Sequence, residues 1–266
     1  MHTSLFDIAE RCLHETEIEQ KVELTRQFAE QWRQKRLTLQ SEHEVLPIAE
    51  PGRPERPKLV RPRELNARKI STPQGQAALI HSICHIEFNA INLAWDAVYR
   101  FRDMPEAYYD GWVQVADEEA YHFQLLREHL NSLNYDYGDF DAHNGLWEMA
   151  QKTAHDPLIR MALVPRVLEA RGLDVTPGIM EKLKSIGDDK AVEILEIIFR
   201  DEVGHVEIGS RWFHYLCEQR ELEPESTFRQ LLSEYMKGTL RGPFHKEARL
   251  KAGFSEEELA YLDGLG

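Results

Sequence analysis

The chain has 266 residues, which is enough for one large domain or two small ones. Its 46 acidic residues outnumber its 32 lysines and arginines, and the formal net charge of −14 disfavours nonspecific nucleic-acid binding over the whole surface. The first residues lack a basic segment followed by an apolar one, and no run of about 18 apolar residues occurs, so we expect neither a secretory signal nor a membrane span.

Apolar residues at helical spacing predict a helical start over residues 4–39. Residues 47–73 differ, because they contain six prolines, which break helices and central strands, and seven basic residues. We expect an extended arm lying on the rest of the protein, and an RNA or partner contact of the basic stretch 53–69 is the alternative. The three cysteines, Cys12, Cys84 and Cys217, are scattered, which favours reduced thiols in a cytoplasmic protein over a disulfide framework.

Two long helices should follow. Thr72-Pro73 combines a capping residue with a first-turn proline, and it predicts a helix that continues to about Phe101. Pro105 predicts the start of the next helix, which continues to about Leu133. Residues 134–156 then form a connection with turn residues, in which 145–153 is a candidate short helix.

The third long segment opens at Asp156-Pro157, is broken by Pro165 and ends near Gly172. Thr176-Pro177 resembles a fresh cap, so the sequence predicts an interruption just after Glu169. A turn at Gly187 leads to a fourth helix over about 191–220, and one or two peripheral helices are expected in 225–266.

The motif Glu-x-x-His occurs twice, as Glu119…His122 and Glu202…His205. Residues three apart share one helix face, so each pair can hold one metal ion. One further Glu from each of two other helices completes the di-metal site of ferritin-like bundles. These extra residues are Glu87, which lies 32 residues before Glu119, and Glu169, which lies 33 before Glu202.

The spacing of these residues repeats between the two halves of the chain. Glu87 lies 18 residues before Pro105, and Glu119 lies 14 after it. Glu169 lies 18 before Gly187, and Glu202 lies 15 after it. At about 1.5 Å per residue, each lone Glu stands at the height of its partner across a helical hairpin. The sequence therefore predicts an all-α, ferritin-like four-helix bundle with a long crossover. The parts are an N-terminal helix and arm (1–72), the bundle (73–220) and peripheral C-terminal helices (221–266).

Carboxylates and imidazoles suit iron or manganese, and four carboxylates with two imidazoles can hold two ions. Solvated helix faces are the plainer interpretation, but the neighbours of these residues are apolar, and burying four carboxylates without cations is very unfavourable. The predicted metal ligands are Glu87, Glu119, His122, Glu169, Glu202 and His205.

Several nearby residues are candidates for supporting roles. Metal-bound histidines donate their other N–H to carboxylates, so Asp201 is expected to hold His122 and Glu118 to hold His205. Simple surface acids are the alternative for both. His81 and His85 are expected to form hydrogen bonds in the core or to line a cavity. The remaining residues that we place near a cavity or behind the ligands are Tyr121, Arg171 and Gly172.

Three segments, Ile80–Glu87, Leu168–Gly178 and Arg200–Val206, resemble a bacterial ferritin-like family catalogued as a domain of unknown function. The resemblance covers about residues 4–220, and it implies a di-metal four-helix bundle with the six ligands above. A tRNA hydroxylase acting on a methylthio-isopentenyl adenosine is a further relative in the same superfamily. The added arm and the Gly172–Pro177 interruption depart from simple ferritins and argue against iron storage alone.

Three functions remain open from the sequence. The first is an O₂-dependent di-iron oxidoreductase or hydroxylase, with O₂ or peroxide, an organic small molecule and a reductase as partners. The second is iron handling by ferroxidation or peroxide scavenging, and a tRNA-modifying hydroxylase is a variant of the first. The third is a non-enzymatic metalloprotein whose two ions, iron or manganese, brace the core. One scaffold hosts many chemistries, so the fold does not decide among them.

Overall fold

The computed structural model describes residues 3–66, 68–236 and 240–264, which fold as α-helices and connecting loops. No β-strand forms within these ranges, where pairing is limited to isolated bridges such as Leu59 with Ala142. The expected all-α class is therefore confirmed. The three cysteines are free and buried. Among the described helices, none is long and apolar enough to cross a membrane.

The chain divides into two compact units. Unit 1 comprises Met1–Gln151 and Ile186–Ile194, and unit 2 comprises Lys152–Ser185 and Leu195–Gly266. The helix α8 (Asp189–Gln219) begins in unit 1 and continues in unit 2.

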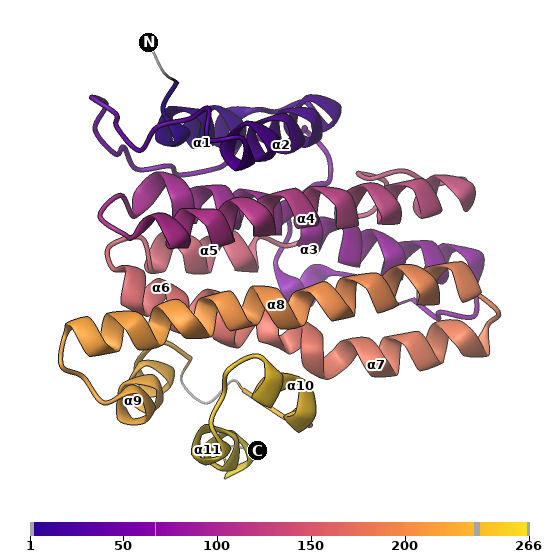
Figure 1. Cartoon of the computed structure of the whole chain (residues 1–266). Helices are drawn as coiled ribbons and strands as arrows, with labels where there is room; N and C mark the ends of the chain where they lie inside the picture. The colour runs from indigo at the N-terminus through magenta and orange to yellow at the C-terminus, as the bar shows by residue number, and fades with distance from the viewer. Residues whose placement is uncertain (1–2, 67, 237–239, 265–266) are drawn as a thin grey trace. The chain divides into compact units, whose positions relative to one another are not determined.

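Unit 1 is built on a hairpin of two long helices, α3 (Pro73–Arg100) and α4 (Glu106–Ser132), which pack along each other (Figure 1). Thr72 caps α3, because its Oγ1 accepts the Gly75 N–H at 3.0 Å, and Pro73 fills the first turn. The predicted bounds of both helices are confirmed to within a residue. The short helix α5 (Gly145–Lys152) also lies where it was expected.

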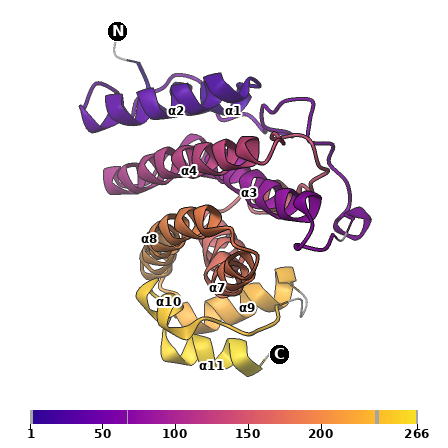
Figure 2. The same cartoon turned by 90° about the vertical axis from the view of Figure 1, so that its right-hand side faces the viewer.

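The N-terminal segment differs from the prediction of one helix, since it forms α1 (Leu5–His14) and α2 (Ile18–Arg33). The chain is extended at Glu15, whose carboxylate accepts the backbone N–H groups of Thr16 and Glu17 at 2.8 and 2.9 Å. Helix α1 packs on α3 and α2 packs on α4, as both views show (Figures 1 and 2).

The proline-rich arm follows the surface of unit 1 with little helical structure beyond the single turn η1 (Pro62–Glu64). Its Gly52 N–H donates to the Leu13 carbonyl at 2.6 Å, at the end of α1. Its Val60 N–H donates to the Ala142 carbonyl at 2.8 Å, so the arm is also tied to the loop after α4.

Unit 2 begins with α6 (Pro157–Leu163), continues into the π-helical segment η2 (Val164–Glu169) and then into α7 (Ala170–Ser185). The C-terminal part holds α9 (Pro224–Met236), α10 (Lys246–Lys251) and α11 (Glu256–Gly264) (Figure 2). The described C-terminal residues thus contain three short helices rather than the expected one or two. They pack locally, α9 on α6, α11 on α9 and α10 on α7.

Candidate metal centre

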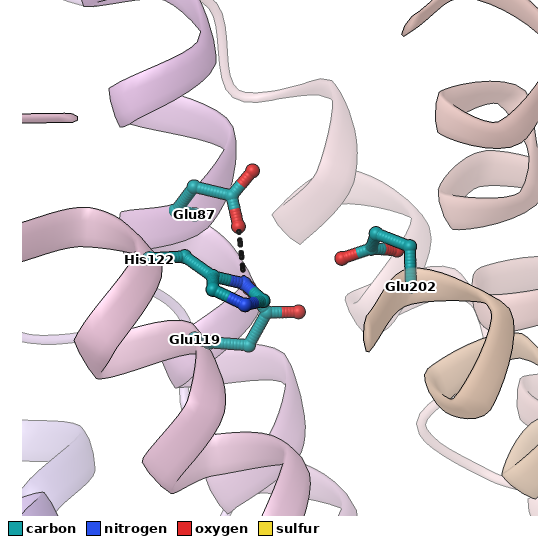
Figure 3. A group of neighbouring side chains, drawn as sticks. All are labelled: Glu87, Glu119, His122 and Glu202. Carbon is teal, nitrogen blue, oxygen red and sulfur yellow. Dashed lines mark hydrogen bonds and ion pairs between the residues drawn. The ribbon is translucent and has the colours of Figure 1, made fainter. Parts of the chain in front are cut away.

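The α3–α4 hairpin of unit 1 brings together Glu87, Glu119 and His122 (Figure 3). Their ligand atoms lie within 4.8 Å of one another, and all three side chains are at most 5% exposed. The Nδ1 atom of His122 is 3.4 Å from an oxygen of Glu87 and 3.4 Å from an oxygen of Glu119. Two carboxylates and one imidazole therefore converge on one buried point.

The local sequence explains this convergence. Glu119 and His122 are three residues apart on α4, so they share one face of the helix. Glu87 stands at the matching height of α3, because the two helices run from a common turn and pack along each other. Apolar neighbours such as Phe88 and Phe123 are buried beside these residues and exclude water.

The electrostatics of the cluster favour a cation. Burial raises the pKa of Glu87 well above its usual range, and the nearby charge of Glu119 raises it further. The imidazole of His122 opposes this shift but does not cancel it. A divalent cation would offset the cost of burying two negative charges, because it neutralises both carboxylates. The neutral imidazole would serve as its third donor. The residues thus fit a metal ion in donor type, burial and charge.

Unit 2 repeats the same motif on α8. The Nδ1 atom of His205 is 3.3 Å from an oxygen of Glu202, which matches the spacing of His122 and Glu119. His205 is buried and the Glu202 side chain is 13% exposed. Each Glu-x-x-His pair therefore adopts one shared geometry within its own unit.

Glu169 is the last residue of the π-helical segment η2, and its Oε2 is buried. Pro165 lies inside this segment and lacks the N–H of an ordinary helical residue, so the backbone widens locally. Such π-helical turns occur frequently at functional sites. The irregularity therefore contains Pro165, where the sequence predicts a break, and it ends at Glu169.

The predicted interruption at Gly172–Pro177 is wrong. Helix α7 continues through both residues, and Pro177 lies within it. A Cβ added to Gly172 would meet nothing within 4 Å, so a small side chain would have room here, and a cavity beside this glycine stays a prediction. The backbone departs from regular α-helical geometry earlier, in the π-helical segment that contains Pro165.

The acids that precede the two motifs have neighbours on their own helices. The Gln114 side-chain amide donates to Glu118 at 3.0 Å, and Arg200 pairs with Asp201 at 2.9 Å. Both acids are half-buried. Their expected bonds to His205 and His122 stay predictions.

His81 and His85 form hydrogen bonds with the loop that follows α4. The Nε2 of His81 accepts the Gly138 N–H at 3.0 Å. The Nε2 of His85 lies 3.1 Å from the His143 carbonyl and 3.0 Å from the Asn89 amide nitrogen, and its Nδ1 lies 2.7 Å from the Tyr137 hydroxyl. Burial lowers the pKa of each histidine to about 4, and both are neutral at pH 7.

The other two candidate residues are more open. Tyr121 is 42% exposed, and its ring centroid lies 6.4 Å from that of His122. Arg171 donates through Nη1 to the Arg241 carbonyl at 3.1 Å, with nearly half of its side chain exposed. Sequence reasoning missed Tyr137 and His143 as partners of His85, because no periodic pattern marks residues in a loop.

The chain matches the family described as "Protein of unknown function (DUF455)" over residues 14–260, and it belongs to this family. A relative from Haemophilus influenzae, named "Uncharacterized protein", is 51% identical over 216 residues. That match covers 79% of this chain and 75% of the relative. No solved structure matches the chain.

Proposed function

We propose that this protein is a ferritin-like, non-haem di-metal carboxylate oxidoreductase that uses O₂ to oxidise an organic substrate. The buried cluster of Glu87, Glu119 and His122 is the observation that carries the proposal. Its motif recurs on α8 with the same internal geometry. In this proposal Glu169, Glu202 and His205 complete a site for two iron ions, or for one manganese and one iron.

The chain's own residues would act as follows. The four carboxylates would hold and bridge two ions, and His122 and His205 would each bind one ion through a neutral nitrogen. Two ferrous ions, when bound, supply the electrons that reduce O₂. The apolar surroundings of Glu87 and Glu119 would exclude water and limit side reactions. A reductase would return the ions to the ferrous state.

Iron oxidation without an organic substrate is the second candidate. The same carboxylates would bind the iron that is oxidised. Helix α7 continues through Gly172 and Pro177, which removes the helix interruption as an argument for a substrate cavity next to Glu169. A tRNA substrate is a variant of the first candidate, favoured by the exposed basic residues of the arm, among them Arg61, Arg63 and Lys69.

Metal stoichiometry tests the proposal. Protein loaded with ferrous iron without O₂ and then desalted should hold about two ions per chain by elemental analysis. Glu119→Ala and Glu202→Ala should each lower this number sharply. The matched controls replace exposed glutamates on the same helices, Glu128→Ala and Glu196→Ala, and should retain it. Full metal content in both ligand variants would rule out the site.

Oxidation chemistry separates the two candidates once loading is established. Reduced protein mixed with O₂ should consume it in the wild type and in both control variants. If excess ferrous iron alone sustains turnover and no organic additive changes the ratio of O₂ to iron consumed, iron oxidation replaces the first candidate.

A further inference from the structure

Unit 1 contains a cavity of about 370 Å³ on the outer side of α3. Its floor is a stripe of α3 that includes Leu79, Ser82 and Ile86. Its walls come from the arm, through Arg68, and from the loop after α4, through Phe140. The volume is within the usual range of small-molecule sites.

Backbone and side-chain hydrogen bonds fix the walls of this cavity. The arm and the loop are joined by two bonds, from Val60 N–H to the Ala142 carbonyl and from Ala142 N–H to the Lys58 carbonyl, at 2.8 and 3.0 Å. The loop is fixed to α3 in turn, because His85 holds the His143 carbonyl and Tyr137. A ligand would therefore meet a loop wall that is already fixed, and would not have to order it.

The cavity lining includes one cationic side chain. Arg68 is the only lysine or arginine among its lining residues in the described part of the chain. Its guanidinium lies 5.0 Å from the centre of the Phe140 ring, and Nη1 donates to the Asn66 carbonyl at 3.4 Å. A guanidinium oriented by an aromatic ring in this way presents its remaining N–H groups as a fork that matches a carboxylate.

The rest of the lining is mainly apolar. Leu79 and Leu146 are part of it, and so is Ile86, which is 46% exposed although it is a large aliphatic residue. His85 is held in place by hydrogen bonds at both of its ring nitrogens. Asp141 is an exposed acid among the lining residues.

We propose that this cavity is a binding site for a small organic carboxylate with an apolar body. The carboxylate would pair with the guanidinium of Arg68, and the body would cover Leu79, Ile86 and Leu146. The proposal is independent of the metal centre, because it depends only on residues that line the cavity.

Binding of octanoate to the purified full chain, measured by calorimetry, tests the proposal. We expect saturable binding of one molecule per chain, and none of octyltrimethylammonium, which has the same tail and the opposite charge. Arg68→Gln should weaken octanoate binding roughly tenfold, since a charge-assisted pair becomes a neutral one. The control Lys69→Gln removes a neighbouring exposed cation outside the cavity and should change the affinity by less than about twofold.

Two variants of the exposed Ser82 test the location. Ser82→Trp should fill the cavity and Ser82→Glu should repel the carboxylate, so both should abolish binding while the circular-dichroism spectrum stays unchanged. Undiminished binding in both variants would overturn the proposal, as would equal binding of the ammonium compound. An equal loss in Arg68→Gln and Lys69→Gln would also overturn it, and so would the absence of saturable octanoate binding by the wild-type protein.

Discussion

Arg166 and Glu258 form a fully buried, two-pronged ion pair in unit 2. The Nη2 of Arg166 donates to both carboxylate oxygens, at 2.8 and 2.7 Å, and neither side chain is more than 1% exposed. Arg166 belongs to the π-helical segment that ends at Glu169, and Glu258 belongs to α11. The guanidinium also lies within 4.6 Å of three ring centroids, those of Phe213, Phe228 and Phe254. The ion pair therefore links α11 to η2, the segment that ends at the predicted metal ligand Glu169.

Removing the charge of Glu258 should therefore destabilise unit 2 strongly. Glu258→Gln leaves the Arg166 cation buried without its counter-charge, which costs about 3–5 kcal/mol when a buried pair is broken. Urea unfolding should show a much lower midpoint, whereas the exposed control Glu257→Gln should stay within about 0.5 kcal/mol of wild type. The double variant Arg166→Met/Glu258→Leu should regain much of the loss, because apolar residues replace the whole pair. If Glu258→Gln lowers the stability as little as the control Glu257→Gln does, the ion pair contributes little.

The stability of unit 1 should depend on pH through Lys21. Its side chain is buried and donates to the Cys12 carbonyl and to the Asn92 Oδ1 at 2.8 and 2.6 Å. Burial lowers the pKa of Lys21 from 10.5 to about 7. Between pH 7 and 10.5 the unfolded chain then holds a proton that the folded chain lacks, so the free energy of unfolding contributed by this group rises with pH. Below pH 7 both states are protonated and the penalty stays constant.

Replacing Lys21 removes this dependence. Lys21→Met should flatten the rise in unfolding free energy between pH 7 and 9 that urea titrations detect in the wild type. Lys35→Met is the control, because Lys35 is exposed and its pKa is raised rather than lowered. A slope that is equally steep in Lys21→Met and wild type would assign the dependence to other groups.

Gly209 should tolerate no side chain. A Cβ at this position of α8 would lie 2.3 Å from the Cγ of Pro165, in the π-helical segment of the same unit. Gly209→Ala should therefore destabilise the protein by about 1–3 kcal/mol, as overpacking does. Gly204 lies on the same helix and a Cβ there would meet nothing within 4 Å, so Gly204→Ala should stabilise by up to about 1 kcal/mol. Thermal unfolding of both variants measures whether their changes in stability have opposite signs. Changes of the same sign would contradict the close contact between Gly209 and Pro165.

The sequence predicted the long helices of unit 1 because their signals are local. Thr72-Pro73 and Pro105 act within one turn, and the Glu-x-x-His spacing needs only a helix to place both side chains on one face. The cluster of Glu87, Glu119 and His122 then followed from matching heights along one hairpin. Nothing in that reasoning needed contacts between distant segments.

The features that the sequence analysis did not predict depend partly on contacts between distant segments. The start of α11 is an exception, because its capping residues lie close together in the sequence. The break after α1 combines the local contacts of Glu15 with a distant one, because Gly52 of the arm donates to Leu13. The sequence marks Pro165 as a break, but it does not mark Gly209, which lies 44 residues later and leaves room for the proline ring. The start of α11 had a readable signal, because Ser255 and Glu258 form a reciprocal cap through bonds of 2.9 and 3.1 Å.

The acids before the two motifs give the last prediction, which rests on the proposed metal centre. If Asp201 and Glu118 hold the ring N–H groups of metal-bound histidines, Asp201→Asn and Glu118→Gln should keep the fold and weaken metal affinity by roughly 10–100-fold. Competition with a chelator of known affinity measures this directly. Asp117 also precedes Glu119 on α4 but pairs with Arg33 at 2.9 Å, so Asp117→Asn is a control that should leave metal affinity unchanged. Equal affinities in Asp201→Asn, Glu118→Gln and the control, with two ions still bound, would make both acids ordinary surface residues and leave the ligand assignment intact. Loss of a single ion in one variant would instead show which half of the site that acid supports.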